Sequence, residues 1–111
     1  MTVEEARRTV SSELRAAIRA ATPRAVHPAD DFESSSVRIA GWDPEEPQSN
    51  DALLHRSTVY LAEHGWQILP ETTDSEDRSA SVSRAGLVEG RLYASNRGLT
   101  FTGTLTEEAG R

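Results

Sequence analysis

The residues of this chain that could perform acid–base or metal chemistry are its three histidines. His55 and His64 lie nine residues apart in a predicted helix, which places them about 180° apart around the axis at 3.6 residues per turn. His27 lies in a segment that we expect to be irregular. Because these spacings give no pair of ligands on one face, the sequence predicts structural roles for the histidines and no metal site.

Carboxylates and serines occur in short runs, at residues 30–31, 43–46, 74–77 and 34–36. None of the acidic runs has the spaced acids and central glycine of a calcium-binding loop, so we expect solvated loops. The serines stand outside a Gly-x-Ser-x-Gly nucleophile elbow. No glycine-rich loop is followed by Lys-Ser or Lys-Thr. The sequence therefore predicts no catalytic residue and no cofactor.

Arginine and aromatic side chains remain as candidates for binding. Arg84, Arg91 and Tyr93 lie on or beside the predicted C-terminal strands, and Trp42 directly follows an earlier strand. Together with Arg97 in a neighbouring turn, the arginines could form a pocket for an anionic ligand. We take Arg84, Arg91, Tyr93 and Trp42 as the candidate ligand- or partner-binding residues.

Length and charge narrow the classes of function. The chain has 111 residues, a formal net charge of −6 and no cysteine, which is the size of one domain and excludes thiolate and disulfide chemistry. Acidic charge disfavours nucleic acid and leaves room for a basic protein partner. No apolar run approaches the ~20 residues of a membrane span. We expect a soluble chain, and the lack of an opening signal segment favours the cytoplasm.

Two helices are predicted to position these groups. The first has a capping-box pattern at Thr2 and Glu5, apolar residues at three- and four-residue steps, and a stop at Pro23. The second begins after Ser49 or Asn50 and ends before a left-handed Gly65. We expect both to be amphipathic.

The C-terminal third predicts antiparallel strands with a defined register. Leu99 to Thr106 alternates apolar residues with threonine, and residues 95–98 form a turn by composition. With Ala94 opposite Leu99, every pair on one face is non-polar, and a slip of one residue destroys that match. The pairs are Ala94–Leu99, Leu92–Phe101, Gly90–Gly103 and Val88–Leu105.

The preceding turn is predicted as the three-residue loop 84–86, with Gly86 at its left-handed position. This loop sets Val82 beside Val88, and Ala80 beside Gly90. The facing glycines Gly90 and Gly103 predict either a close approach of a helix or a Trp ring, or a bend or bulge in the sheet.

The sequence thus predicts a single α+β domain over residues 1–111. Two amphipathic helices pack on one face of an antiparallel sheet that contains a C-terminal three-stranded meander. An exposed meander edge could also pair with a second copy as a homodimer. The predicted helices span about 3–21 and 50–64, the strands about 37–41, 66–70, 80–83, 87–94 and 99–105, and residues 23–36 form an irregular connector.

One resemblance follows from the layout of residues 49–106. A helix ending in Leu-Ala-Glu-His-Gly-Trp (61–66), a short strand, an acidic loop and a hairpin ending in Leu-Thr-Phe-Thr-Gly-Thr-Leu (99–105) resemble small extracytoplasmic lipoprotein-type domains of high-GC Gram-positive bacteria. The resemblance implies a bacterial helix–sheet module without assigned enzymatic activity. It carries over no functional residue.

Three functions remain open from the sequence. The leading hypothesis is a non-enzymatic binding or accessory domain that recognises a protein or small ligand through the outer face of the sheet or the acidic loops. The second is an acidic immunity or inhibitor protein that neutralises a basic partner. The third is a small hydrolase, which requires a histidine to converge with a carboxylate in a cleft.

Overall fold

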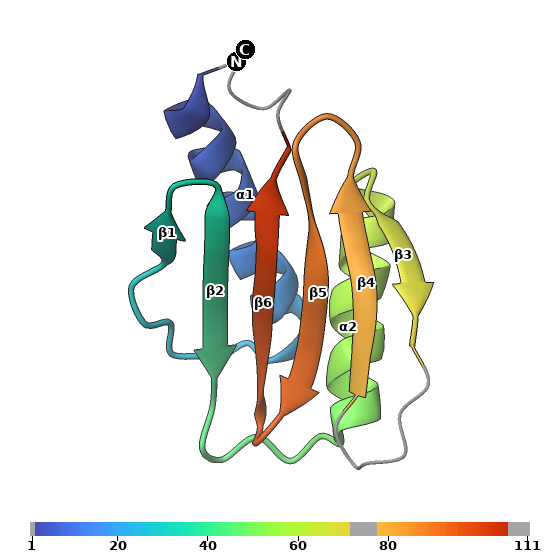
Figure 1. Ribbon diagram of the computed structural model, residues 1–111. Helices are drawn as coiled ribbons and strands as arrows, with labels where there is room; N and C mark the ends of the chain where they lie inside the picture. Colours follow the sequence, from blue (N-terminus) through green and yellow to red (C-terminus); the bar gives the residue numbers. More distant parts are fainter. Residues whose placement is uncertain (1, 72–77, 107–111) are drawn as a thin grey trace.

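Two helices and a six-stranded antiparallel sheet make up the computed structural model, which describes residues 2–71 and 78–106 (Figure 1). The helices lie side by side on one face of the sheet, which confirms the predicted α+β class. None of the described helices is long and apolar enough to cross a membrane. The elements are α1 (Val3–Ala21), β1 (Asp31–Glu33), β2 (Ser36–Trp42), α2 (Asn50–Glu63), β3 (Gln67–Pro70), β4 (Arg78–Arg84), β5 (Val88–Ser95) and β6 (Gly98–Leu105), and the strand order is β1-β2-β6-β5-β4-β3.

Helix α1 begins and ends where the sequence predicts. The Thr2 hydroxyl accepts a hydrogen bond of 3.1 Å from the Glu5 N–H, which satisfies one free donor of the first turn. The helix ends at Ala21, before Pro23. Its apolar stripe is fully buried against the sheet and against α2, and consists of Ala6, Val10, Leu14, Ala17, Ile18 and Ala21.

Helix α2 ends in the Schellman geometry that the sequence predicts. Gly65 has a φ of 89°, and its N–H donates to the Ala62 carbonyl over 3.3 Å. The Trp66 N–H donates to the Leu61 carbonyl over 3.0 Å, and the Trp66 ring turns into the core. At the other end, the Ser49 hydroxyl caps the helix by accepting from the Ala52 N–H.

The predicted register between β5 and β6 is confirmed at every position. Ala94 pairs with Leu99, Leu92 with Phe101, and the apolar side chains of these pairs are buried. The connecting turn is shorter than predicted, because Ser95 pairs with Gly98 and leaves a two-residue loop. Both loop residues, Asn96 and Arg97, have positive φ (49° and 65°), as in the turns that match the twist of a hairpin.

The predicted register between β4 and β5 is wrong by two residues. Arg84 pairs with Val88, so Val82 lies opposite Gly90 rather than Val88. The loop is residues 85–87, because Leu87 turns into the core and donates its N–H to the Arg84 carbonyl. Gly86 still takes the left-handed conformation, with φ 76°. Because the shift is by two, each side chain keeps its predicted face.

The predicted irregular connector contains a short strand, β1, which pairs with β2 through a tight turn. Sequence reasoning missed it because three residues are too few to show alternation. Strands β2 and β3 cover the two sides of the meander β4–β5–β6. Both edges of the meander are therefore paired, and β1 and β3 border the sheet that the described residues form. The homodimer through a sheet edge stays a prediction.

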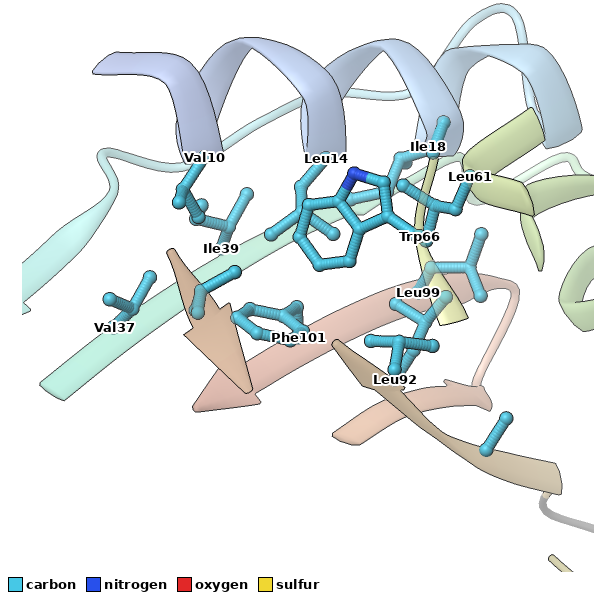
Figure 2. Close-up of a cluster of buried hydrophobic side chains, with 14 of the residues drawn as sticks. Val10, Leu14, Ile18, Val37, Ile39, Leu61, Trp66, Leu92, Leu99 and Phe101 are labelled. Atoms are coloured by element: carbon cyan, nitrogen blue, oxygen red, sulfur yellow. The ribbon is translucent and has the colours of Figure 1, made fainter. Parts of the chain in front are cut away.

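The facing glycines are explained by the ring of Phe101. A Cβ added at Gly90 or Gly103 would lie 2.7 or 2.6 Å from Phe101 Cζ, so the tip of the ring occupies the space above both positions. Strands β5 and β6 pair without a bulge here. Trp66 approaches Phe101 rather than the glycines, edge-on with ring centroids 6.4 Å apart (Figure 2).

Candidate functional site

No helix or strand of the described residues covers the sheet face opposite the helices, and we call it the open face. Side chains alternate between the two faces along each strand, and the pairing register aligns the outward residues in rows across the sheet. An acidic row contains Glu33, Ser36, Thr104, Glu89, Ser83 and Gln67. An arginine row contains Asp31, Arg38, Thr102, Arg91, Ser81 and Leu69. Two further rows contain Ala40, Thr100, Tyr93 and Ser79, and then Val26, Trp42, Gly98 and Ser95.

Three of the four predicted binding residues share this open face. Arg91, Tyr93 and Trp42 all project from it, in successive rows. Arg84 does not, because it stands on the same side of β4 as buried Val82 and forms an ion pair with Glu13 of α1. Arg84 therefore ties a helix to the sheet instead of facing a partner.

The arginines do not form an anion pocket. The Arg91 Nε lies 2.8 Å from Glu71 Oε1, so its charge is neutralised on the open face. Arg97 uses Nη1 to donate to the Glu46 carbonyl at the hairpin turn. Because Arg84 lies on the opposite face, the three guanidinium groups do not converge on one binding site.

Apolar surface collects at one end of the open face. Trp42 is 41% exposed, and Val26 beside it is 56% exposed. The two backbones exchange hydrogen bonds of 2.7 and 3.1 Å, which holds the side chains on neighbouring positions of one face. Sequence reasoning missed Val26 because an isolated bridge leaves no period in the sequence.

A shallow hollow of about 770 Å³ occupies the other side of the open face, across β3 to β6. Leu69 borders it and is 69% exposed, so its side chain is accessible from the hollow. Glu89 contributes a carboxylate. Sequence reasoning missed both, although the alternation of β5 already places Glu89 beside Arg91. The outward-facing lining residues are Gln67, Leu69, Ser81, Ser83, Glu89 and Thr104.

The histidines are held separately. His27 bonds through Nδ1 to the Ala40 carbonyl at 3.0 Å, and Arg19 Nε donates to its Nε2. His64 stacks on Tyr60, with ring centroids 4.1 Å apart, and its Nδ1 bonds to the Tyr60 carbonyl. Within residues 2–71 and 78–106, no group of three His, Asp or Glu residues could hold a metal ion. The predicted acidic loop at 74–77 lies outside the described residues.

Glu46 forms a polar corner where the loop before α2 meets the end of α1. The side chain is only 5% exposed, and its carboxylate accepts hydrogen bonds from the Gln48 backbone and side-chain N–H groups. The Thr22 hydroxyl beside it and these Gln48 bonds lower the pKa of Glu46, against the burial that raises it; Arg56 also lowers it. Gln48 in turn donates to the Ala21 carbonyl, so this corner serves to join the elements.

Comparison with protein-family models, curated proteins and solved structures finds no match. The resemblance to lipoprotein-type domains stays an expectation from the sequence. The geometry of the open face is therefore the basis of the proposed function.

Proposed function

We propose that this chain is a non-enzymatic binding domain that holds a protein partner against its open face. The observation that carries the proposal is the exposure of Trp42 beside Val26 on a sheet face that none of the described elements covers. Burying such side chains against a partner removes apolar surface from water. Exposed apolar groups on an otherwise polar sheet face therefore favour association.

The composition of the open face supports a protein partner. Protein interfaces are enriched in Trp, Tyr and Arg, and this face carries Trp42, Tyr93, Arg38 and Arg91. Between them lie mostly serine and threonine, which are short and leave the surface accessible. The four central strands have seven or eight residues and span roughly 14 by 23 Å at about 4.8 Å per strand, and the shorter β1 and β3 extend the face on either side. That is the footprint of a modest protein interface rather than of a small ligand.

The test compares two side chains of equal exposure on opposite sides of the molecule. Trp42 on the open face and Val59 on α2 are both 41% exposed. The chain contains no lysine, so an amine-reactive biotin at neutral pH couples to the terminal amine and leaves the open face unmodified. The biotinylated wild-type, Trp42→Ala, Tyr93→Ala and Val59→Ala proteins are used to capture partners from extracts of the source cells, and the captured partner is purified for titration.

We expect the partner to bind wild type and Val59→Ala alike, and Trp42→Ala and Tyr93→Ala at least tenfold more weakly. Circular dichroism verifies that every variant is folded. Loss of binding in Val59→Ala with retention in both open-face variants would move the interface to the helices. Capture of a soluble polysaccharide with no protein would also overturn the proposal.

A second candidate is an acidic immunity or inhibitor protein that neutralises a basic partner. Two observations favour it: the net charge of −6, and the carboxylates of Glu33 and Glu89, which have no ion pair among the described residues. This candidate predicts a basic partner whose association rate falls steeply as salt is raised from 0.05 to about 0.5 M. An acidic partner, or a rate insensitive to salt, would contradict it. The histidine geometry gives the hydrolase alternative no support.

A further inference from the structure

We infer that the hollow across β3 to β6 receives a cationic side chain, preferably arginine, from a basic segment of the protein partner. This inference rests on the proposed function and assigns one contact within it.

Glu89 gives the hollow an uncompensated negative charge. Its side chain is exposed and has no hydrogen bond or ion pair in the described part of the chain. The neighbouring cation on the same strand, Arg91, is already paired with Glu71. A cation entering the hollow therefore meets a free carboxylate, whereas none of the described residues that line the hollow offers an anion a positive charge.

The groups beside Glu89 fit a guanidinium. Thr104 and Ser83 lie opposite Glu89 on the two adjacent strands, and their hydroxyls have no hydrogen-bond partner among the described residues. Two carboxylate oxygens and two hydroxyl oxygens are thus available within one row. Arginine has five N–H donors in a planar fork, against three on the lysine ammonium. The row therefore has more acceptors than an ammonium can use at once.

Leu69 offers an apolar surface on which the hydrocarbon stem of the entering side chain can pack. It borders the hollow in the next row and is 69% exposed. Arginine carries three methylene groups that pack on apolar surface while the charged end stays with polar partners. An ammonium ion has no such stem, so Leu69 favours a cation carried on a hydrocarbon chain.

The probe is a hexa-arginine amide peptide, titrated into the ¹⁵N-labelled full-length protein and followed by NMR. Glu89→Gln is compared with Glu63→Gln, which removes an exposed carboxylate of α2 that has no partner among the described residues. Both variants change the net charge by the same amount. We expect the largest shifts at the amides of Ser81, Ser83, Glu89 and Thr104. We expect Glu89→Gln to raise the Kd at least fivefold, Glu63→Gln less than twofold, and Leu69→Ser two- to threefold.

Several results would overturn the inference. Equal weakening by Glu89→Gln and Glu63→Gln would mean that the peptide responds to net charge alone. Spermidine binding in the hollow as tightly as the peptide would mean that the site takes free polyamines. Hexa-lysine binding more tightly than hexa-arginine would remove the guanidinium preference. If Trp42→Ala abolishes partner capture while Glu89→Gln leaves both capture and peptide binding intact, the binding face stands and the cation site falls.

Discussion

Two neighbouring residues of β6 show how differently the two faces of this sheet are specified. Phe101 points toward the helices, is fully buried, and requires glycine at two adjacent positions to make room for its ring. Thr102 points to the open face, where its neighbours are Arg38 and Arg91. Packing constrains the covered face closely, whereas folding places few demands on the open face. Large or charged residues on the open face therefore need an explanation other than stability.

The largest expected effect tests this contrast directly. Phe101→Ala should lower the free energy of unfolding by about 3–5 kcal/mol, because it removes a buried ring and leaves a cavity. Thr102→Ala, one residue away, should change it by less than about 0.5 kcal/mol. Urea denaturation followed by tryptophan fluorescence measures both. A cost above about 2 kcal/mol for Thr102→Ala would mean that the open face also contributes to the core.

The second-largest expected loss of stability comes from filling the space that Gly103 leaves for the Phe101 ring. Gly103→Ala should cost about 1–3 kcal/mol, because its Cβ would collide with the Phe101 ring and with the Glu89 carbonyl. In a Phe101→Leu background the ring collision disappears and the carbonyl collision remains. The cost of Gly103→Ala should therefore fall in that background without vanishing, as measured by a double-mutant cycle. A cost that is identical in both backgrounds would show that the ring is irrelevant to Gly103.

The covered face was also the part of the molecule that could be predicted from the sequence. Its apolar residues recur with periods that follow from helix and strand geometry, and the pairing of Ala94 with Leu99 puts every apolar partner on one side, which a slip of one residue would not. The errors of the sequence-based prediction lie where the apolar alternation fits more than one register equally well. The shift by two residues between β4 and β5 keeps both faces intact, so alternation cannot detect it.

The open face could be predicted only in part. Alternation placed Arg91 and Tyr93 on one side of the sheet, but it could not show that Arg84 would reach a helix. Val26 joins the face through a single bridge, and Leu69 becomes a border of the hollow only once β3 is placed at the sheet edge. Contacts between segments distant in the chain leave no local period, so these residues appear only in the structure.

A third comparison sets a buried carboxylate against an exposed one. At pH 7, Glu46→Gln should destabilise the protein by about 1.5 kcal/mol, because hydrogen bonds to a charged acceptor are weakened, whereas Glu89→Gln should have almost no effect. The folded-state pKa of Glu46 lies below its ordinary value of 4.5. Its stabilisation is therefore present above pH 4.5 and is lost as the pH falls through the lower, folded-state pKa.

Urea denaturation between pH 3 and pH 7 measures this dependence. The difference in unfolding free energy between wild type and Glu46→Gln should shrink as the pH falls below 4.5. A difference for Glu46→Gln that grows on acidification would contradict the sign of the pKa shift.

The smallest expected difference lies between two ion pairs, one on each face. Arg84 and Glu13 join the sheet to α1, with side-chain exposures of 37% and 18%, while Arg91 and Glu71 lie on the open face at 49% and 29%. Water screens the second pair more fully, so Glu13→Gln should cost about 1 kcal/mol and Glu71→Gln less than about 0.5 kcal/mol. Urea denaturation in low salt and in 1 M NaCl measures both. Salt should reduce the two costs and bring them closer together. A larger cost for Glu71→Gln would mean that the open-face pair stabilises the fold, and Arg91 would then need no partner to explain its presence.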